Sequence, residues 1–237
     1  GKPGVRQDIT VTIEGTDDRP VVSGPDTGTA TEDTQPTTGG KLDITDPDTG
    51  LPPRFAPQTG VAGQYGTFAI DADGNWTYTL DNNRPDIQAL GKGDTHTEQF
   101  TVTGIDSSGK PGVRQDITVT IEGTDDLAVI TGTHAGTVSE DTTLTASGKL
   151  DITDVDSGLP PVFNAQTLTG SYGELAIDAD GNWTYTLDNT RSDIQAMGTG
   201  DTHAEHFTVT ATDAAGRVTR QQIAVTIEGT DDLAVIT

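Results

Sequence analysis

The sequence has no cysteine, few aromatic residues (5%) and only 13 basic residues against 37 acidic ones. Without cysteine there is no disulfide, so a stable fold must depend on packing or on a bound metal. No hydrophobic run approaches the ~20 residues of a membrane-spanning helix, so we expect no direct membrane insertion. The net charge of −24 repels nucleic acid and anionic lipid, and neither is an expected partner.

Long segments of the chain occur twice. GKPGVRQDITVTIEGTDD at residues 1–18 returns unchanged at 109–126, and a looser third copy ends at 232. IDADGNWTYTLDN starts at 70 and again at 177, and DITDxDxGLPP starts at 43 and again at 151. The distance along the chain from one copy to the next is too long for one solenoid unit and matches the length of one β-sandwich domain. The chain is therefore expected to come from a tandem array.

Hydrophobic residues make up only 31% of the chain, but they alternate strictly with polar ones. Ile117, Val119 and Ile121 are separated by single polar residues, a pattern that predicts strands rather than disorder. Turn residues recur every ~8–12 positions, as in all-β domains. In the first full repeat we predict seven strands, near residues 20–31, 40–45, 54–59, 66–70, 75–80, 98–105 and 113–122.

The fold class that follows is all-β, with tandem immunoglobulin-like or cadherin-like β-sandwich domains joined end to end. Trp76, Tyr78 and Leu80 share one face of their strand, and we expect that face to be buried because a Trp buries more apolar area than a Thr. DADGN at 71–75 predicts a tight hairpin. One short helical turn is expected at Asp86–Leu90, with Asp86 as its cap.

Strand direction sorts the acidic loops into two ends of each domain. In an up-and-down sandwich, one end collects the loop after the first strand, the loop after the fifth strand and the exit linker. The opposite end collects the loops after the second, fourth and sixth strands. Stacking two domains end to end then brings carboxylates from both domains to one junction, on either side of the linker Asp125-Asp126.

Six or more carboxylates in one small interface favour a bound cation. At ~5 Å and an effective dielectric constant of about 20, each like-charge pair costs roughly 3 kcal/mol. Calcium is the predicted ion, because it accepts 6–8 oxygen ligands from several loops in irregular geometry. The predicted ligands, taken over all junctions, are Asp17, Asp18, Glu32, Asp33, Asp46, Asp48, Asp106, Asp125, Asp126, Glu140, Asp141, Asp154, Asp156, Asp213, Asp231 and Asp232.

Other chemistry is poorly supported. DADGN resembles the start of an EF-hand loop, but its glycine comes too early and Asn82 stands where the bidentate Glu would be. His203 and His206 lie on a predicted strand, which directs them to opposite faces. No nucleophile elbow is present, and a complete active site repeated in every domain would be unusual, so we expect no enzyme. Trp76 and Trp183 could line a sugar platform, but their alternation assigns them to the core.

Four segments carry a family resemblance: TVSEDTTLTASGKLDITDVDSG, YGELAIDADGNWTYTLDN, FTVTATDAAG and VTIEGTDDLAVIT. In this order and spacing they resemble the VCBS repeat of giant bacterial RTX-type adhesins, over residues 19–232. The resemblance implies a cadherin-like sandwich, calcium at the junctions, export by a type I secretion system and a place in the extender region on the cell surface. For the junction it implies calcium ligands at Glu32, Asp33, Asp125, Asp126, Asp154 and Asp156.

The sequence thus predicts structural extender repeats of a secreted adhesin, rigidified by calcium. The expected segments are a last strand of a preceding repeat (1–18), repeat 1 (19–124), a calcium-binding linker (125–126), repeat 2 (127–232) and the start of a further repeat (233–237). The expected partners are neighbouring repeats, while other domains of the parent protein would contact polysaccharide, host or biofilm surfaces. The alternative is that the repeat itself binds polysaccharide or mediates cell–cell contact, which would call for an exposed aromatic patch.

Overall fold

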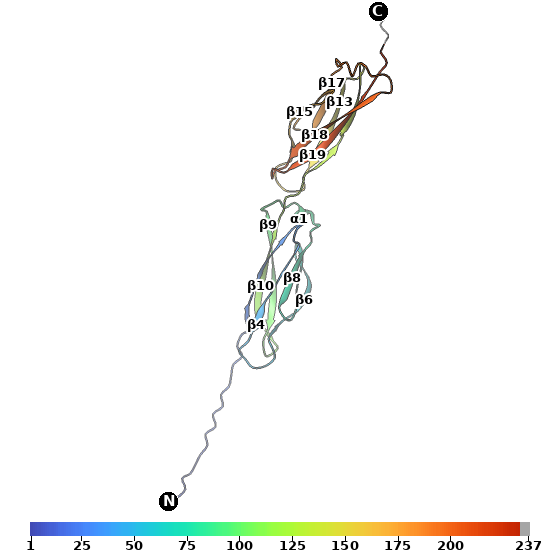
Figure 1. The fold of residues 1–237 in the computed structure, drawn as a ribbon. Helices are drawn as coiled ribbons and strands as arrows, with labels where there is room; N and C mark the ends of the chain where they lie inside the picture. Colours follow the sequence, from blue (N-terminus) through green and yellow to red (C-terminus); the bar gives the residue numbers. More distant parts are fainter. Residues whose placement is uncertain (233–237) are drawn as a thin grey trace, which may run out of the picture. The chain divides into compact units, whose positions relative to one another are not determined.

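The computed structural model describes residues 1–232, so the expected start of a further repeat at 233–237 lies outside the described residues. The chain divides into two compact units. The first comprises Gly1–Arg84 and Thr95–Glu122, and the second comprises Pro85–Asp94 and the residues from Gly123 on. Each unit is a β-sandwich (Figure 1), which confirms the predicted fold class.

The first unit contains two four-stranded sheets and a two-stranded ribbon. Its strands are β1 (Val21–Ser23), β2 (Thr27–Thr31), β3 (Thr37–Lys41), β4 (Asp43–Thr45), β5 (Arg54–Phe55), β6 (Gln58–Ala62), β7 (Gly66–Ile70), β8 (Asn75–Leu80), β9 (Thr95–Ile105) and β10 (Pro111–Glu122). One sheet has the order β2-β10-β9-β5 and the other β3-β8-β7-β6, while β1 pairs with β4. The pair β2–β10 is parallel, and the others are antiparallel.

The second unit repeats this plan with sheets of five and four strands. Its elements are α1 (Pro85–Gln88), β11 (Val129–Gly132), β12 (Ala135–Ser139), β13 (Thr145–Thr153), β14 (Val162–Phe163), β15 (Gln166–Thr169), β16 (Gly173–Ile177), β17 (Asn182–Leu187), β18 (Thr202–Thr212) and β19 (Val218–Glu228). The orders are β11-β13-β17-β16-β15 and β12-β19-β18-β14. Again the first strand of a sheet, β12, runs parallel to the last, β19.

The first predicted strand, near 20–31, is in fact two strands that belong to different sheets. Gly24 has φ +104° between β1 and β2, and Pro25 has no N–H to donate. A Cβ at Gly24 would lie 2.5 Å from the carbonyl oxygen of Lys41. Gly132 has φ +102° at the same place in the second unit. The chain therefore changes sheets at a glycine.

Other boundaries also differ from the expected ones. The second strand begins earlier and is divided into β3 and β4, the third is divided into β5 and β6, and β9 begins at Thr95. The helical turn expected at Asp86–Leu90 is α1, Pro85–Gln88, which starts with a proline at the first helical position. The expected hairpin is confirmed, because β7 and β8 pair around 71–74.

The core of each sandwich is built from the alternating strands. Trp76 is 1% exposed and Tyr78 is fully buried, as are Ile117, Val119 and Ile121. This confirms the predicted inward face. Within residues 1–232, no helix is long and apolar enough to span a membrane.

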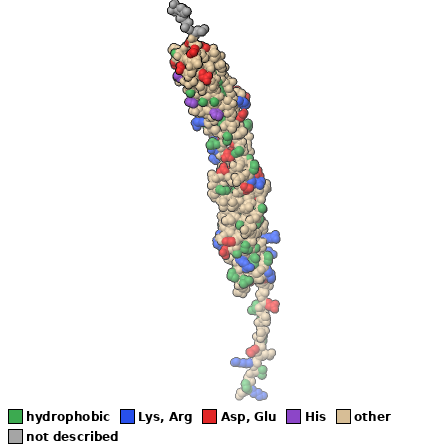
Figure 2. Space-filling view, turned by 90° about the vertical axis from the view of Figure 1, so that its right-hand side faces the viewer, with side chains coloured by type: hydrophobic (Ala, Val, Ile, Leu, Met, Phe, Trp, Pro, Cys, Tyr) green, Lys and Arg blue, Asp and Glu red, His purple; other side chains and the backbone are tan. Residues whose placement is uncertain are grey.

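Residues 1–19 contain no helix or strand. Val5, Ile9, Val11 and Ile13 are each at least 77% exposed, and Figure 2 shows the segment as a single row of side chains. The same eighteen letters at 109–126 include β10, in which Ile117, Val119 and Ile121 are buried. Burial of this sequence therefore depends on a sandwich to receive it.

Candidate functional site: acidic loops of each sandwich

An acidic recess of about 230 Å³ lies among loops of the second unit. Asp154 and Asp156 belong to the loop after β13, and Asp213 belongs to the turn between β18 and β19. Asp94 and Asp125 complete its acidic lining. Four of these five aspartates were predicted as ligands from the sequence. The fifth, Asp94, was not predicted.

Backbone N–H groups hold one oxygen of each loop carboxylate. Asp126 N–H donates to Asp156 Oδ2 (2.8 Å), Asp156 N–H to Asp154 Oδ1 (3.1 Å) and Arg217 N–H to Asp213 Oδ1 (2.7 Å). These are the local bonds that favour Asp in turns. Asp156 Oδ1 and Asp213 Oδ2 are buried and have no hydrogen-bond partner among residues 1–232. Two buried acceptors are therefore available to a ligand.

The charge state of Asp156 reflects this setting. Burial raises the pKa of Asp156, and the neighbouring charges of Asp154 and Asp125 raise it further. The hydrogen bond from Asp126 N–H and the charge of Arg217 act in the opposite direction. The net result is a carboxylate that would gain from a nearby cation.

The first unit repeats this arrangement. Asp18 N–H donates to Asp48 Oδ2 (2.6 Å), and Asp48 N–H donates to Asp46 Oδ1 (3.0 Å). Lys110 N–H donates to Asp106 Oδ1 (2.8 Å), and this bond, with the Ser108 hydroxyl and N–H, lowers the pKa of the 5%-exposed Asp106. Asp17 lies 3.8 Å from Lys110 Nζ. The same loops and the same backbone hydrogen bonds thus occur in both units.

A second acidic group lies near the chain's described C-terminal end. Glu140 is fully buried, its Oε1 accepts the Thr230 N–H (2.8 Å), and its Oε2 has no hydrogen-bond partner among residues 1–232. Asp231 Oδ1 accepts the N–H of Thr199 (3.0 Å). Asp232, the last described residue, is exposed.

Asp33 and Asp141 hold the turn beside a buried glutamate. Both have positive φ, 56° and 59°, a conformation that costs energy for a residue with a side chain. Each exchanges hydrogen bonds with an asparagine: Asp33 with Asn82 (2.9 and 2.7 Å) and Asp141 with Asn189 (3.2 and 2.8 Å). The preceding Glu32 is fully buried, like its counterpart. The carboxylates of both aspartates thus already serve the fold.

The donor chemistry of these loops suits calcium, although the side chains do not converge. Across residues 1–232, no three His, Asp or Glu side chains form a group that could hold a metal ion. The available atoms are carboxylate oxygens, which are the ligands calcium prefers, and two of them in the recess are buried without partners. Asp125, Asp154, Asp156 and Asp213 are the residues that would hold an ion in this recess.

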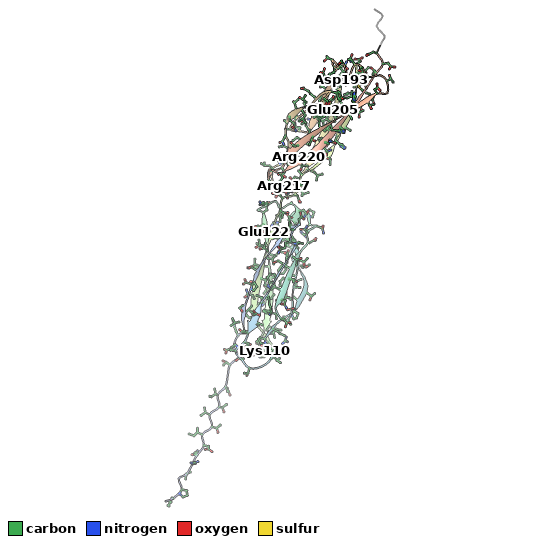
Figure 3. The ribbon with its side chains drawn as sticks, viewed as in Figure 1. Lys110, Glu122, Asp193, Glu205, Arg217 and Arg220 are labelled. Atoms are coloured by element: carbon green, nitrogen blue, oxygen red, sulfur yellow. The ribbon has the colours of Figure 1, made fainter. Side chains whose placement is uncertain are left out.

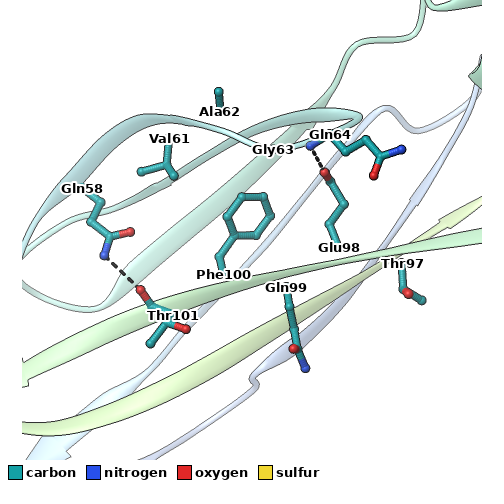
Figure 4. Close-up of a pocket in the computed structure, with 10 residues that line it drawn as sticks. All are labelled: Gln58, Val61, Ala62, Gly63, Gln64, Thr97, Glu98, Gln99, Phe100 and Thr101. Atoms are coloured by element: carbon teal, nitrogen blue, oxygen red, sulfur yellow. Dashed lines mark hydrogen bonds between the residues drawn. The ribbon is translucent and has the colours of Figure 1, made fainter.

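A larger groove, between β6 and β9, has a structural role. Figure 4 shows Glu98 pointing into it toward Gln64. Glu98 is 8% exposed and accepts bonds from the N–H groups of Gln64 and Tyr65 (2.9 Å for Tyr65) and from the Tyr78 hydroxyl (2.6 Å). Both oxygens of this carboxylate are therefore occupied by the chain itself.

The same arrangement recurs in the second unit. Glu205 accepts bonds from the N–H groups of Ser171 and Tyr172 (2.9 Å for Tyr172) and from the Tyr185 hydroxyl (2.6 Å). Burial, then the bond to Glu205, raises the pKa of Tyr185, so its hydroxyl remains a donor. The sequence reasoning missed this pair of glutamates. Glu98 and Glu205 lie two residues before Phe100 and Phe207, on the same buried face of their strands, and this spacing could have revealed them.

The partly exposed tyrosines already have aromatic partners. Tyr65 stacks on His96 with ring centroids 4.6 Å apart, and Arg84 lies over the Tyr65 ring at 5.8 Å. Tyr172 stacks in the same way on His203, at 4.7 Å. His96 and His203 thus each occupy one face of a tyrosine ring that could otherwise stack on a sugar.

Among solved structures, the chain is similar to the extracellular domain of protocadherin gammaB4, with 19% identity and a TM-score of 0.50 over 94% of this chain and 34% of that one. It is also similar to EC22–24 of mouse cadherin-23, with 18% identity and a TM-score of 0.49 over 90% and 67%. The chain thus spans about a third of the protocadherin chain, and the likeness concerns the fold alone. No curated protein matches the sequence.

A bacterial cadherin-like domain matches the sequence twice, and the two matches cover most of the chain. They agree with the two sandwiches, in which β2 runs parallel to β10 and β12 runs parallel to β19. The chain belongs to the bacterial cadherin-like domain family, with one copy at residues 17–123 and a second at 125–229.

Proposed function

We propose that these two domains are extender repeats of a secreted cell-surface adhesin and that calcium at the acidic loops stiffens the junctions between repeats. Cadherin-like domains are typically extracellular adhesion or extender modules and generally bind calcium. The observation that carries the proposal is the pair of buried carboxylate oxygens without hydrogen-bond partners, Asp156 Oδ1 and Asp213 Oδ2, in one acidic recess.

The repeated use of the same loops supports a shared role at every junction. Asp18 N–H bonds to Asp48 as Asp126 N–H bonds to Asp156, so the GTDD segments at 15–18 and 123–126 are attached to the domain that follows each of them by the same N–H. In this proposal residues 1–18 end a preceding repeat, 19–124 and 127–232 are the two domains, and Asp125-Asp126 is the calcium-binding linker. Type I secretion would deliver the array to the cell surface.

A bound divalent cation would neutralise the facing carboxylates and tie their loops together. At a calcium concentration ten times the Kd, binding stabilises the bound form by about 1.4 kcal/mol per site. Extracellular modules bind calcium with Kd values of roughly 10⁻⁴–10⁻³ M. Such sites would be filled outside the cell and empty at the low calcium concentration of the cytosol, which would leave the chain looser for export.

The test is a calcium titration by calorimetry, together with small-angle X-ray scattering in millimolar calcium and in chelator. We expect saturable binding, a narrower distribution of particle dimensions with calcium and a higher Tm. The double variant Asp156→Asn/Asp213→Asn keeps the shape of both side chains and should lose at least about tenfold in affinity at its site.

The matched control is Asp43→Asn/Asp151→Asn, which removes the same charge from two aspartates paired with exposed lysines outside the recess. Its calcium affinity should remain near that of the parent protein. Absence of binding up to about 10 mM calcium, ten times the weak end of the expected range, would refute the proposal. Equal losses in the two double variants would also refute the assignment of the recess.

A further inference from the structure

A basic side chain from the same position of the fold contacts the GTDD segment beside each acidic cluster. Lys92 is a further basic residue in the lining of the second unit's recess. Lys110 precedes β10, and Arg217 precedes β19, one residue after the glycine of each turn. Arg217 Nη1 donates to the backbone carbonyl of Asp125, and Lys110 Nζ lies 3.8 Å from Asp17 Oδ2. Asp17 and Asp125 are the same letter of the GTDD segment.

The recurrence is informative because basic residues are scarce, 13 in the whole chain. The turns read SSGK and AAGR, so a cation is retained where two neighbouring positions change. Figure 3 labels Lys110 in the first unit and Arg217 in the second. The charge of Arg217 acts on Asp156 of the acidic recess. That recess is also lined by Asp213, whose Oδ2 is a buried acceptor without a hydrogen-bond partner among residues 1–232.

We propose that Lys110 and Arg217 are built-in counter-ions that hold the GTDD segment when calcium is absent and weaken calcium binding at their own cluster, Arg217 more strongly than Lys110. This inference rests on the proposed calcium function. A fixed cation and calcium compete for the same negative potential, so the cation stabilises the metal-free loops and repels the incoming ion.

Arg217 and Lys110 differ in how strongly they interact with the GTDD segment. Arg217 makes a direct hydrogen bond and is only partly exposed. The Lys110–Asp17 pair is long, and its side chains are 72% and 50% exposed, so water and salt screen it. We therefore expect the Asp154–Asp156–Asp213 cluster to bind calcium more weakly than the Asp46–Asp48–Asp106 cluster, and the titration of the parent protein to show two phases.

The experiment compares Arg217→Gln with Arg220→Gln. Arg220 is exposed on β19, close to Arg217 in Figure 3, and its loss changes the net charge equally. Both are made in a background with Asp18→Asn/Asp48→Asn, which removes two carboxylates of the first cluster. Calcium binding is measured by calorimetry, and Tm is measured in chelator and in calcium.

We expect Arg217→Gln to bind calcium about sixfold more tightly, the effect of removing a unit charge ~8 Å from a divalent ion at a dielectric constant of about 80. Its Tm in chelator should fall, whereas its Tm in saturating calcium should not. Arg220→Gln should change the affinity by less than about twofold. A mere loss of packing at position 217 would lower both Tm values and would not tighten binding.

The outcomes separate the two proposals. If calcium binds but Arg217→Gln and Arg220→Gln behave alike, the counter-ion inference is overturned and the calcium function stands. If no variant binds calcium, the calcium function fails and the competition fails with it. In that case the Tm in chelator still shows whether Arg217 holds the segment.

Discussion

The buried tyrosine hydroxyl that bonds to Glu98 offers a sharp test of how these sandwiches are stabilised. Tyr78→Phe removes one oxygen from the core and leaves the ring in place. The hydroxyl donates to Glu98 Oε2 at 2.6 Å, and the residue is fully buried. Burial, then the bond to Glu98, raises the pKa of Tyr78, so the hydroxyl is protonated and donating throughout the physiological pH range.

The size of the expected loss in stability follows from the carboxylate oxygen that Tyr78→Phe leaves without its hydroxyl donor. Glu98 Oε1 keeps its two backbone donors, but Oε2 loses its hydroxyl donor in a place that is 8% exposed. A hydrogen bond to a charged group is worth about 1.5–3 kcal/mol, so we expect a loss of about 2 kcal/mol in the free energy of unfolding. In a domain of ~100 residues this corresponds to a fall in Tm of roughly 10 °C.

The assay is denaturant unfolding followed by tryptophan fluorescence. Each sandwich contains one buried tryptophan, so a Trp183→Phe background leaves Trp76 as the reporter of the first unit. The control is Tyr65→Phe, which removes the same atom from a partly exposed tyrosine whose hydroxyl accepts a bond from Gln64 Nε2. The control should change stability by less than about 0.5 kcal/mol. If Tyr78→Phe is equally mild, the hydroxyl–carboxylate bond does not stabilise the core, and the reasoning is wrong.

Two further predictions concern the acidic loops. Asp156→Asn should raise the metal-free Tm by a few degrees at neutral pH and weaken calcium binding. Because the pKa of Asp156 is raised in the folded protein, folding favours its protonated form. The difference in Tm between variant and parent should therefore shrink as pH falls through that pKa and vanish near pH 3. Asp141→Ala should lower the Tm of the second sandwich by about 5 °C, because it loses the bonds from Asn189 and Gln195 in a left-handed turn. Asp141→Asn should leave the Tm nearly unchanged. Equal effects of the two substitutions would contradict the role of Asp141 in holding the turn.

Much of the fold was predictable because it depends on alternation. The period of two placed Trp76, Tyr78 and Leu80 inside, and burial in the structure agrees. The division of the first strand was not predictable from that pattern, because it arises from the backbone of Gly24 and from the two different strands that β1 and β2 pair with. Pairing partners are properties of the folded chain and leave no local periodicity.

The candidate site was predictable in part, because loops at one end of a sandwich must be neighbours. That reasoning gathered Asp154, Asp156 and Asp213, which line one recess. The bond from Arg217 to the carbonyl of Asp125 was not predictable, because a single basic residue at a turn carries no signal in composition. The sequence also did not distinguish Asp141, whose carboxylate already accepts bonds from the chain's own side chains.

Hydrogen-bond accounting separates two kinds of buried acid in this protein, and acidity alone does not. Glu98 and Glu205 bring both oxygens to donors supplied by the same sandwich, so each carboxylate organises a turn between strands and has little to offer a ligand. Asp156 and Asp213 use one oxygen for a backbone N–H and keep the other buried without a partner among residues 1–232. A buried acceptor left in that state lowers stability by about 1–3 kcal/mol or more when charged. A bound cation would offset this cost, and this difference in pairing is why we propose calcium for the loop aspartates rather than for the core glutamates.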